Sequence, residues 1–309
     1  MIDQLKISIV LPCFNEQGNI KVITEKLIAI LHKYSDYELI FVDDGSTDNS
    51  LSIIKELVQT NPKIKYLSFS RNFGHQNALK AGMDVSHGDC LITMDADLQH
   101  PPELIPTMIE KWLEGYDVVY TMRNDTEKTS FFKRLTARIF YYLINKISNI
   151  EIPSGTADFR LMDKRVVEIF KSFQESFIFI RGLIAWMGFK QYGLVYIPQE
   201  RFSGQTKYSL KGMIFLALSG ITAFSVRPLH LATILGLILA GLSIIYGIYA
   251  VCITIFTHRV ISGWASVIVS VLFIGSVQLI ILGIIGEYLG KLFIASKNRP
   301  NYIIKEKSF

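Results

Sequence analysis

The chain has 309 residues, half of them hydrophobic and only 19% charged, with a formal net charge of +5. A mean hydropathy of +0.32 is too high for an ordinary soluble enzyme, and the composition excludes a disordered chain, a disulfide scaffold and a basic nucleic-acid-binding tail. Residues 1–226 carry 25 basic and 25 acidic side chains, so the whole positive charge belongs to the remaining 83 residues.

Short runs rich in β-branched and aromatic residues alternate with helical patterns in the first part of the chain. The expected strands are residues 6–11, 38–42, 65–69, 90–94 and 117–120, and helical patterns follow the first four at 20–31, 53–57, 79–85 and 102–113. Alternation with crossovers of about 10 to 15 residues predicts an α/β unit on a mostly parallel sheet, covered on both faces.

Polar segments follow four of these strands. Ligands bind beyond the carboxyl ends of parallel strands, so we expect the chemistry at residues 12–16, 43–48, 70–76 and 95–99. The first segment, PCFNEQGN, lacks the G-x-G-x-x-G spacing that a dinucleotide pyrophosphate needs, and the sequence has no G-x-x-x-x-G-K-[ST] motif. These two patterns argue against a Rossmann dehydrogenase and a P-loop nucleotide hydrolase.

Two carboxylates end the fourth expected strand. Strand alternation directs Asp95 and Asp97 to one side of the sheet, just where the strand leaves it. Their mutual repulsion favours a cation, and Mg²⁺ or Mn²⁺ combines a few carboxylates with substrate phosphate oxygens and water. A D-x-D spacing alone is a weak signal, but after an apolar strand it predicts a metal site for a nucleoside diphosphate.

A second pair of acids, Asp43 and Asp44, ends the second expected strand before Gly45. A turn in which Asp48 caps the next helix would explain one acid in this segment. It does not explain two adjacent ones. We therefore expect Asp43 and Asp44 to hydrogen-bond a nucleobase and ribose, and one of them to assist the metal.

Six ordered segments resemble the family 2 glycosyltransferases of GT-A fold: LPCFNE, VDDGSTDNS, RNFGHQNALKAG, GDCLITMDADLQHPPE, DFRLMD and RFSGQTKYS. More narrowly, they resemble the polyprenyl-phosphate glycosyltransferases, which include bactoprenol glucosyltransferases and dolichol-phosphate mannose synthases. The resemblance extends over almost the whole chain. It implies a Rossmann-like GT-A domain over residues 1–207 that binds a nucleotide sugar and a polyprenyl phosphate.

The resemblance also implies roles for single residues. Those that line the nucleotide pocket are Pro12, Asn15 and Glu16. Asp44 lies near the base in this scheme. Asp95 and Asp97 carry the metal and the diphosphate, and Gln99 is a further metal contact. The cofactor implied is Mg²⁺ or Mn²⁺.

Basic residues between the sheet and the end of the chain suit an acceptor phosphate. Arg123 ends the fifth expected strand, and Arg134 and Arg138 share one face of an amphipathic helix over 131–147. We expect these three to bind the acceptor phosphate, although a solvated basic helix edge would look the same. A helix that combines an apolar stripe with basic residues also suits a membrane interface. The same pattern recurs over residues 208–226 and predicts a second interfacial helix.

Two further segments are candidates for catalytic residues. Arg201 and Lys207 flank a glycine in RFSGQTKYS, and in the family this loop closes over the diphosphate, where both cations would neutralise charge on the departing nucleotide. Asp158 lies in DFRLMD. In the reaction that the resemblance implies, the nucleophile is a phosphate oxygen that is already ionised at neutral pH. Asp158 is therefore expected to orient the acceptor or a sugar hydroxyl in a single-displacement, inverting transfer.

Two charge-free runs, residues 231–257 and 260–286, lie near the end of the chain. Each would be about 40 Å long as a helix, enough to cross a hydrocarbon core of about 30 Å. Buried helices of soluble proteins rarely lack charge over such a length. The runs predict a transmembrane hairpin over 227–292, with spans at about 229–257 and 260–288.

Basic residues flank both runs and set the expected orientation. They are Lys207, Lys211 and Arg227 before the first run and Lys291, Lys297, Arg299, Lys305 and Lys307 after the second, with Arg259 as the one charge between. The positive-inside bias predicts an inner- or plasma-membrane protein whose catalytic domain, termini and basic tail over 293–309 are cytoplasmic. Small residues in the runs permit close helix packing, which leaves a homo-oligomer such as a tetramer open: Gly236, Ala240, Gly241, Gly283 and Gly286.

The expected reaction is transfer of glucose from UDP-glucose to undecaprenyl phosphate, which serves cell-envelope glycan modification, and GDP-mannose is the alternative donor. A processive polysaccharide synthase would carry Q-x-x-R-W, a pattern that none of the ten glutamines begins. An inactive nucleotide-binding membrane protein would have lost the metal and cation positions, which are intact. No nucleic-acid partner is expected.

Overall fold

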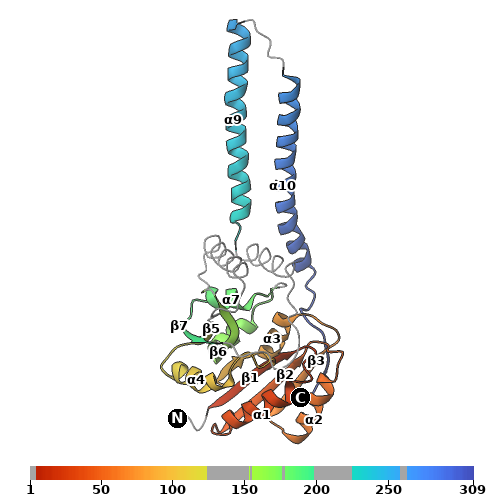
Figure 1. Cartoon of the computed structure of the whole chain (residues 1–309), viewed down its shortest axis with the longest axis vertical. Coiled ribbons are helices and arrows are strands. Elements are labelled where there is room, and N and C mark those ends of the chain that lie inside the picture. Colours follow the sequence, from red (N-terminus) through yellow and green to blue (C-terminus); the bar gives the residue numbers. More distant parts are fainter. Residues whose placement is uncertain (1–4, 124–152, 154, 176–177, 198–224, 258–262) are drawn as a thin grey trace. The chain divides into compact units, whose positions relative to one another are not determined.

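The computed structural model describes the chain except for residues 1–4, 124–152, 154, 176–177, 198–224 and 258–262 (Figure 1). The described residues separate into two units. One contains the sheet and includes Arg299–Phe309, and the other is helical and ends at Asn298. Both interfacial helices expected from the sequence, over 131–147 and 208–226, fall almost wholly outside the described residues.

One eight-stranded sheet organises the first unit, in the order β7-β5-β6-β4-β1-β2-β3-β8. Its strands are β1 (Lys6–Cys13), β2 (Asp36–Asp43), β3 (Ile64–Phe69), β4 (Cys90–Thr93), β5 (Val118–Arg123), β6 (Thr156–Asp163), β7 (Gln191–Tyr196) and β8 (Ile304–Lys307). Only β6 and β8 run antiparallel to their neighbours. The mostly parallel sheet expected from the sequence is confirmed, and the two antiparallel strands are additions to it.

Helices cover both faces of the sheet. They are α1 (Ile20–Leu31), α2 (Ser50–Thr60), α3 (His75–Asp84), α4 (Ile105–Leu113) after the short 3-10 helix η2 (Pro102–Leu104), α6 (Lys164–Lys171) and α7 (Ile180–Trp186). Ile7, Ile9 and Leu11 of β1 share a buried core with the apolar stripe of α1. Val10, which alternation turns to the opposite face, meets α3.

Gly82 allows α3 to lie close to β1, because a Cβ at this position would lie 2.2 Å from Val10 Cγ1. We expect Gly82→Ala to lower the free energy of unfolding by about 1 to 3 kcal/mol. The overlap outweighs the gain of about 1 kcal/mol in helix propensity. Chemical denaturation followed by circular dichroism measures the loss. Combined with Val10→Ala, the same change should cost little. An equal loss in both backgrounds would contradict this packing.

Two long apolar helices, α9 (Arg227–Thr257) and α10 (Trp264–Ser296), make up the second unit. Both are long and apolar enough to cross a membrane, with windows of mean hydropathy 2.3 and 2.4. Their large side chains point outward: Leu237 is 69% exposed and Leu279 is 71% exposed. A helix that is apolar all round is typical of a protein core or of a membrane span, and these two are mostly exposed. The expected pair of apolar helices is therefore confirmed, and its insertion in a membrane stays a prediction.

The end of the chain differs most from the sequence-based expectation. The second membrane span is predicted to end near residue 288, and the helix α10 continues beyond that point to Ser296. Residues 293–309 were expected only as a basic tail, yet β8 (Ile304–Lys307) is an edge strand of the sheet beside β3. The four residues of β8, IKEK, are too few and too polar for their pattern to predict a strand.

Candidate active site

The turns after β1 and β2 are joined to each other at the carboxyl edge of the sheet. Asn15 has a positive φ of 54°, which asparagine tolerates better than most residues. Its Oδ1 accepts a hydrogen bond from the Thr47 amide at 2.8 Å, and its own amide donates to Ser46 Oγ at 3.0 Å. The Glu16 amide likewise donates to Ser50 Oγ at 2.8 Å. Together with Pro12, which is buried in β1, the predicted pocket residues therefore meet at one edge.

The acids that end β2 hold neighbouring loops in place. Asp43 is buried and accepts hydrogen bonds from the Ser46 amide at 3.0 Å and from Ser68 Oγ at 2.8 Å. Asp44 accepts hydrogen bonds from the backbone amides of Phe73 and Gly74. Burial raises the pKa of Asp44, and the two amides oppose that rise. Each acid thus organises a loop at the expected site, while their contacts with a nucleotide stay a prediction.

His75, the first residue of α3, lies beside the D-x-D segment. Its Nε2 is 2.7 Å from Asp95 Oδ1. Burial disfavours the charged forms of both side chains. Their mutual attraction outweighs this effect, and the negative charge of Asp158 further stabilises the charged form of His75. The pKa of His75 is raised to about 9 and that of Asp95 is lowered to about 2. The pair is therefore an ion pair at neutral pH, which the sequence did not predict.

The remainder of the D-x-D segment is a tight turn. The Asp95 amide donates to His100 Nδ1 at 3.1 Å, and Asp97 Oδ1 accepts from the Gln99 amide at 3.1 Å. No three histidine, cysteine or acidic side chains converge as a metal site in the part of the chain that the structure describes. Two carboxylates, Asp95 and Asp97, fit an ion that completes its shell with diphosphate oxygens and water.

Asp158 on β6 lies at the centre of a second cluster and is 6% exposed. Arg181 of α7 binds it through two hydrogen bonds, Nε to Oδ1 at 2.8 Å and Nη2 to Oδ2 at 2.9 Å. Gln76 Nε2 donates to Oδ2 at 3.3 Å, and Arg160 Nη2 lies 3.6 Å from Oδ1. Burial disfavours the charge of Asp158, but Arg181, Arg160 and His75 outweigh it and hold its pKa well below the usual range.

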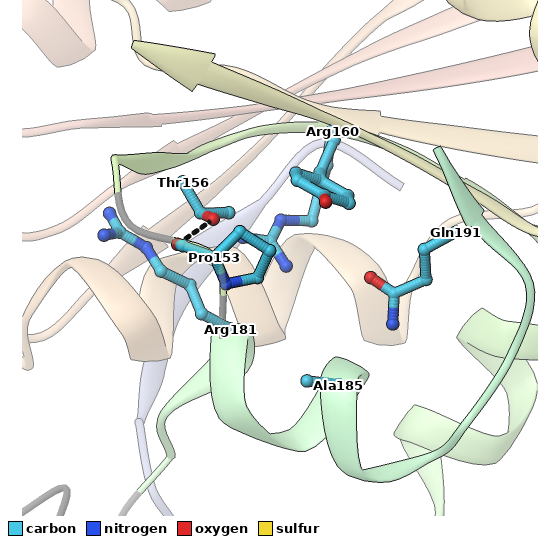
Figure 2. A pocket seen from close by; sticks show the side chains of 7 residues that line it. Pro153, Thr156, Arg160, Arg181, Ala185 and Gln191 are labelled. Carbon is cyan, nitrogen blue, oxygen red and sulfur yellow. Dashed lines mark hydrogen bonds between the residues drawn. The ribbon is translucent and has the colours of Figure 1, made fainter. Parts of the chain in front are cut away.

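A small pocket adjoins this second cluster. Figure 2 shows Arg160 of β6 and Arg181 of α7 in its wall, together with Thr156 and Gln191. Thr156 Oγ1 donates to the carbonyl of Pro153 at 2.6 Å, as the dashed line in Figure 2 marks. The pocket therefore combines two guanidinium groups with neutral polar side chains beside a buried carboxylate.

The sequence-predicted basic residues are placed only in part. Arg123 is the exposed last residue of β5, and its amide donates to the Gly155 carbonyl at 2.9 Å. The others lie outside the described residues: Arg134, Arg138, Arg201 and Lys207. Sequence reasoning missed His75 and Gln76, although both stand in the expected segment 70–76. It also missed Arg181, for which no motif gave a signal.

The His75 pair predicts a pH dependence of stability in metal-free protein. Because the pKa of His75 rises from 6.5 to about 9 on folding, its contribution is complete below pH 6.5 and is lost as the pH rises through about 9. Melting temperatures in EDTA for wild type and His75→Gln should therefore differ most at pH 6 and converge by pH 10. A difference that does not change with pH would contradict the ion pair.

Comparisons with known proteins agree with this architecture. The family model of glycosyl transferase family 2 matches residues 8–170, and that of the GtrB C-terminal hairpin matches residues 227–292. A prophage bactoprenol glucosyl transferase homolog of Escherichia coli (strain K12) is 43% identical over 303 residues, 97% of this chain and 99% of that protein. The bactoprenol glucosyl transferase of Shigella phage SfV is 43% identical over 305 residues, 98% of this chain and 99% of that protein.

Solved structures extend the comparison to the fold. The crystal structure of mannosyl-3-phosphoglycerate synthase from Rubrobacter xylanophilus has a TM-score of 0.52 at 18% identity, over 71% of this chain and 73% of that one. At this identity the likeness shows the fold alone. The family models match the sheet domain and the hairpin, and the relatives match over nearly the whole of both chains. This chain is therefore a member of glycosyl transferase family 2, a glycosyltransferase of GT-A fold with a GtrB-type C-terminal hairpin.

Proposed function

We propose that this enzyme transfers one hexose from a nucleotide sugar to a polyprenyl phosphate at the cytoplasmic face of the membrane. Glucose from UDP-glucose and undecaprenyl phosphate are the preferred substrates, and the product serves cell-envelope glycan modification. The observation that carries the proposal is the likeness over nearly the whole chain, hairpin included, to proteins named bactoprenol glucosyl transferases. GDP-mannose is the second candidate donor.

The donor side of the proposed mechanism lies at the carboxyl ends of β1, β2 and β4. Asp95 and Asp97 would hold Mg²⁺ or Mn²⁺, with Gln99 as a further contact, and the ion would supply positive charge to the departing diphosphate. His75 fixes the orientation of Asp95 through the 2.7 Å contact. The loops that Asp43, Asp44, Asn15 and Glu16 organise would line the site for the base and ribose.

The acceptor side would use the second cluster and the basic segments. A phosphate oxygen is already ionised at neutral pH, so the displacement needs no strong base. Asp158, whose pKa Arg181 holds far below the usual range, is correspondingly suited to orienting a substrate group. We assign the acceptor phosphate to Arg123, Arg134 and Arg138, and the charge on the leaving nucleotide to Arg201 and Lys207. A single displacement would invert the anomeric centre and give a β-linked product.

The proposal includes the membrane arrangement. The GT-A domain over 1–207 and the interfacial helix over 208–226 would lie on the cytoplasmic side, with the hairpin over 227–292 as the anchor. The bias of basic residues toward the outer ends of the two runs supports this orientation. Cysteine substitution and labelling with a membrane-impermeant maleimide in sealed vesicles would test it, because only the loop around Arg259 should react from the far side.

A panel of donors tests the proposed reaction. Purified full-length protein in nanodiscs would receive undecaprenyl phosphate, MgCl₂ and radiolabelled UDP-glucose, UDP-galactose, UDP-N-acetylglucosamine or GDP-mannose. We expect label in the lipid fraction with UDP-glucose at the highest rate. Preference for GDP-mannose would replace the donor by the second candidate. No transfer to lipid from any donor, with MnCl₂ as well as MgCl₂, would contradict the proposal.

A further inference from the structure

The last residues of the chain complete the edge of the catalytic sheet. In β8, Lys307 pairs with Leu67 and Ile304 pairs with Phe69 of β3. Just beyond β3, the Ser70 amide donates to the Ile303 carbonyl at 3.0 Å. The segment that follows the second apolar helix therefore binds β3 up to the point where the loop 70–74 begins.

Tyr302 makes two contacts that differ in kind. Its ring stacks on Phe69, with centroids 5.1 Å apart and an interplanar angle of 16°. Its hydroxyl donates to Asp84 Oδ2 at 2.8 Å. Burial and the charge of Asp84 raise the pKa of Tyr302, so the hydroxyl remains a donor at any physiological pH. One side chain thus ties the last residue of β3 to the last residue of α3.

The segment between these two residues supplies parts of the donor site. The ring of Phe73 packs edge-on against Phe69, with centroids 5.7 Å apart, and the amides of Phe73 and Gly74 hold the carboxylate of Asp44. His75 then begins α3 and contacts Asp95. The partners of both acids therefore lie in a segment that Tyr302 fixes at its two ends.

The backbone approach at this loop leaves little room for displacement. Gly45, which follows Asp44, has a φ of 70°, and a Cβ on it would lie 2.5 Å from the carbonyl carbon of Arg71. The loop 70–74 thus packs directly on the turn after β2. The two backbones are in close contact, so the loop cannot move toward the turn. Any other shift of the loop would displace the amides of Phe73 and Gly74 from the carboxylate of Asp44.

We propose that Tyr302 is a positioning residue for nucleotide binding, through which the C-terminal segment sets the geometry of Asp44 and His75. The inference rests on the proposed function, in which these residues belong to the donor site. Tyr302 itself does not touch the reacting atoms. Donor affinity in this enzyme thereby depends on residues that follow the membrane hairpin in the chain.

Isothermal titration of full-length protein in detergent with UDP, and separately with GDP, in MnCl₂ tests the inference. For Tyr302→Leu we expect the Kd of the nucleotide that wild type binds to rise about tenfold, since the stack and the hydroxyl are both lost. For Tyr302→Phe, which keeps the stack, we expect a rise of about threefold. The KM for donor should rise in parallel, while kcat changes by less than about twofold.

Two controls separate positioning from a general loss of stability. Glu306→Gln removes the half-buried ion pair with Lys55, 2.7 Å long, from the same segment, and should leave the Kd unchanged. Hydrogen exchange of the peptide 70–77 should be faster in Tyr302→Leu than in wild type, before any global unfolding. Should Tyr302→Leu not fold, Tyr302→Phe decides.

The outcomes distinguish this inference from the function on which it rests. Unchanged Kd and unchanged exchange of residues 70–77 in folded Tyr302 variants, with a lower melting temperature alone, would overturn the positioning role and leave the proposed function intact. A wild-type protein that binds neither UDP nor GDP would overturn both.

Discussion

Replacing Asp97 with asparagine is expected to lower the rate of sugar transfer by about a thousandfold, which corresponds to about 4 kcal/mol of transition-state stabilisation. The amide has the same shape as the carboxylate and can still accept the hydrogen bond from the Gln99 amide. It lacks the negative charge that would hold a divalent ion against the diphosphate. Single-turnover transfer of labelled sugar at saturating donor and metal measures the effect.

The matched control for this variant is Asp117→Asn. Asp117 immediately precedes β5 and pairs with Arg165 at 2.6 Å. Since β5 runs in the direction of β4, Asp117 lies at the opposite edge of the sheet from Asp97. Its side chain is 17% exposed and also accepts a hydrogen bond from the Lys190 amide at 3.1 Å. We expect its replacement to change transfer by less than about twofold, because these contacts lie away from the metal site. Transfer at the wild-type rate in folded Asp97→Asn would remove the carboxylate from the metal site.

Asp158 and Arg181 are expected to act as a unit. Asp158→Asn should lower kcat/KM by about a hundredfold, because the neutral amide no longer holds the guanidinium of Arg181 or orients a substrate group. Arg181→Leu should lower activity similarly and also reduce the free energy of unfolding by about 2 to 3 kcal/mol. It leaves a buried carboxylate without the partner that makes two hydrogen bonds to it.

The double variant Asp158→Asn/Arg181→Leu provides the internal control. It should be more stable than Arg181→Leu alone, since no buried carboxylate then lacks its partner. Its activity should be close to that of either single variant. Denaturation curves and steady-state kinetics on all four proteins measure the coupling. Additive losses in both stability and activity would show that the two residues work independently.

Much of the fold followed from local patterns. The strands β1 to β5 were expected within two or three residues at nearly every boundary, because each is a buried apolar run ended by a polar turn. The strand β6 was not expected. Its residues Thr156, Asp158 and Arg160 share one face, and they belong to the polar cluster rather than to the core. Ala157, Phe159 and Leu161, which alternate with these residues, belong to the hydrophobic core. The alternation is typical of a strand, so the sequence did carry a signal for β6, and the polar residues were interpreted only as a site motif.

The candidate site, like the fold, could be predicted from the sequence only in part. The placement of Asn15, Asp44 and Asp95 at one edge of the sheet could be predicted, because parallel strands end at the same edge. The pairing of Asp95 with His75, and of Asp158 with Arg181, could not be predicted. These contacts join segments far apart in the chain, and no spacing in the sequence encodes a distance between side chains on different elements. The same holds for Tyr302, which reaches Phe69 and Asp84 from the end of the chain.

The chemical identity of the acceptor tests the central claim most directly. Full-length protein in nanodiscs, supplied with UDP-glucose and MgCl₂, would receive undecaprenyl phosphate in one reaction and undecaprenol in another, and lipids would be analysed by mass spectrometry. The account predicts one added hexose on undecaprenyl phosphate, release of one UDP per hexose, and no product from undecaprenol. Release of UDP without a glycolipid, a polymer of several hexoses, or equal transfer to undecaprenol would contradict it.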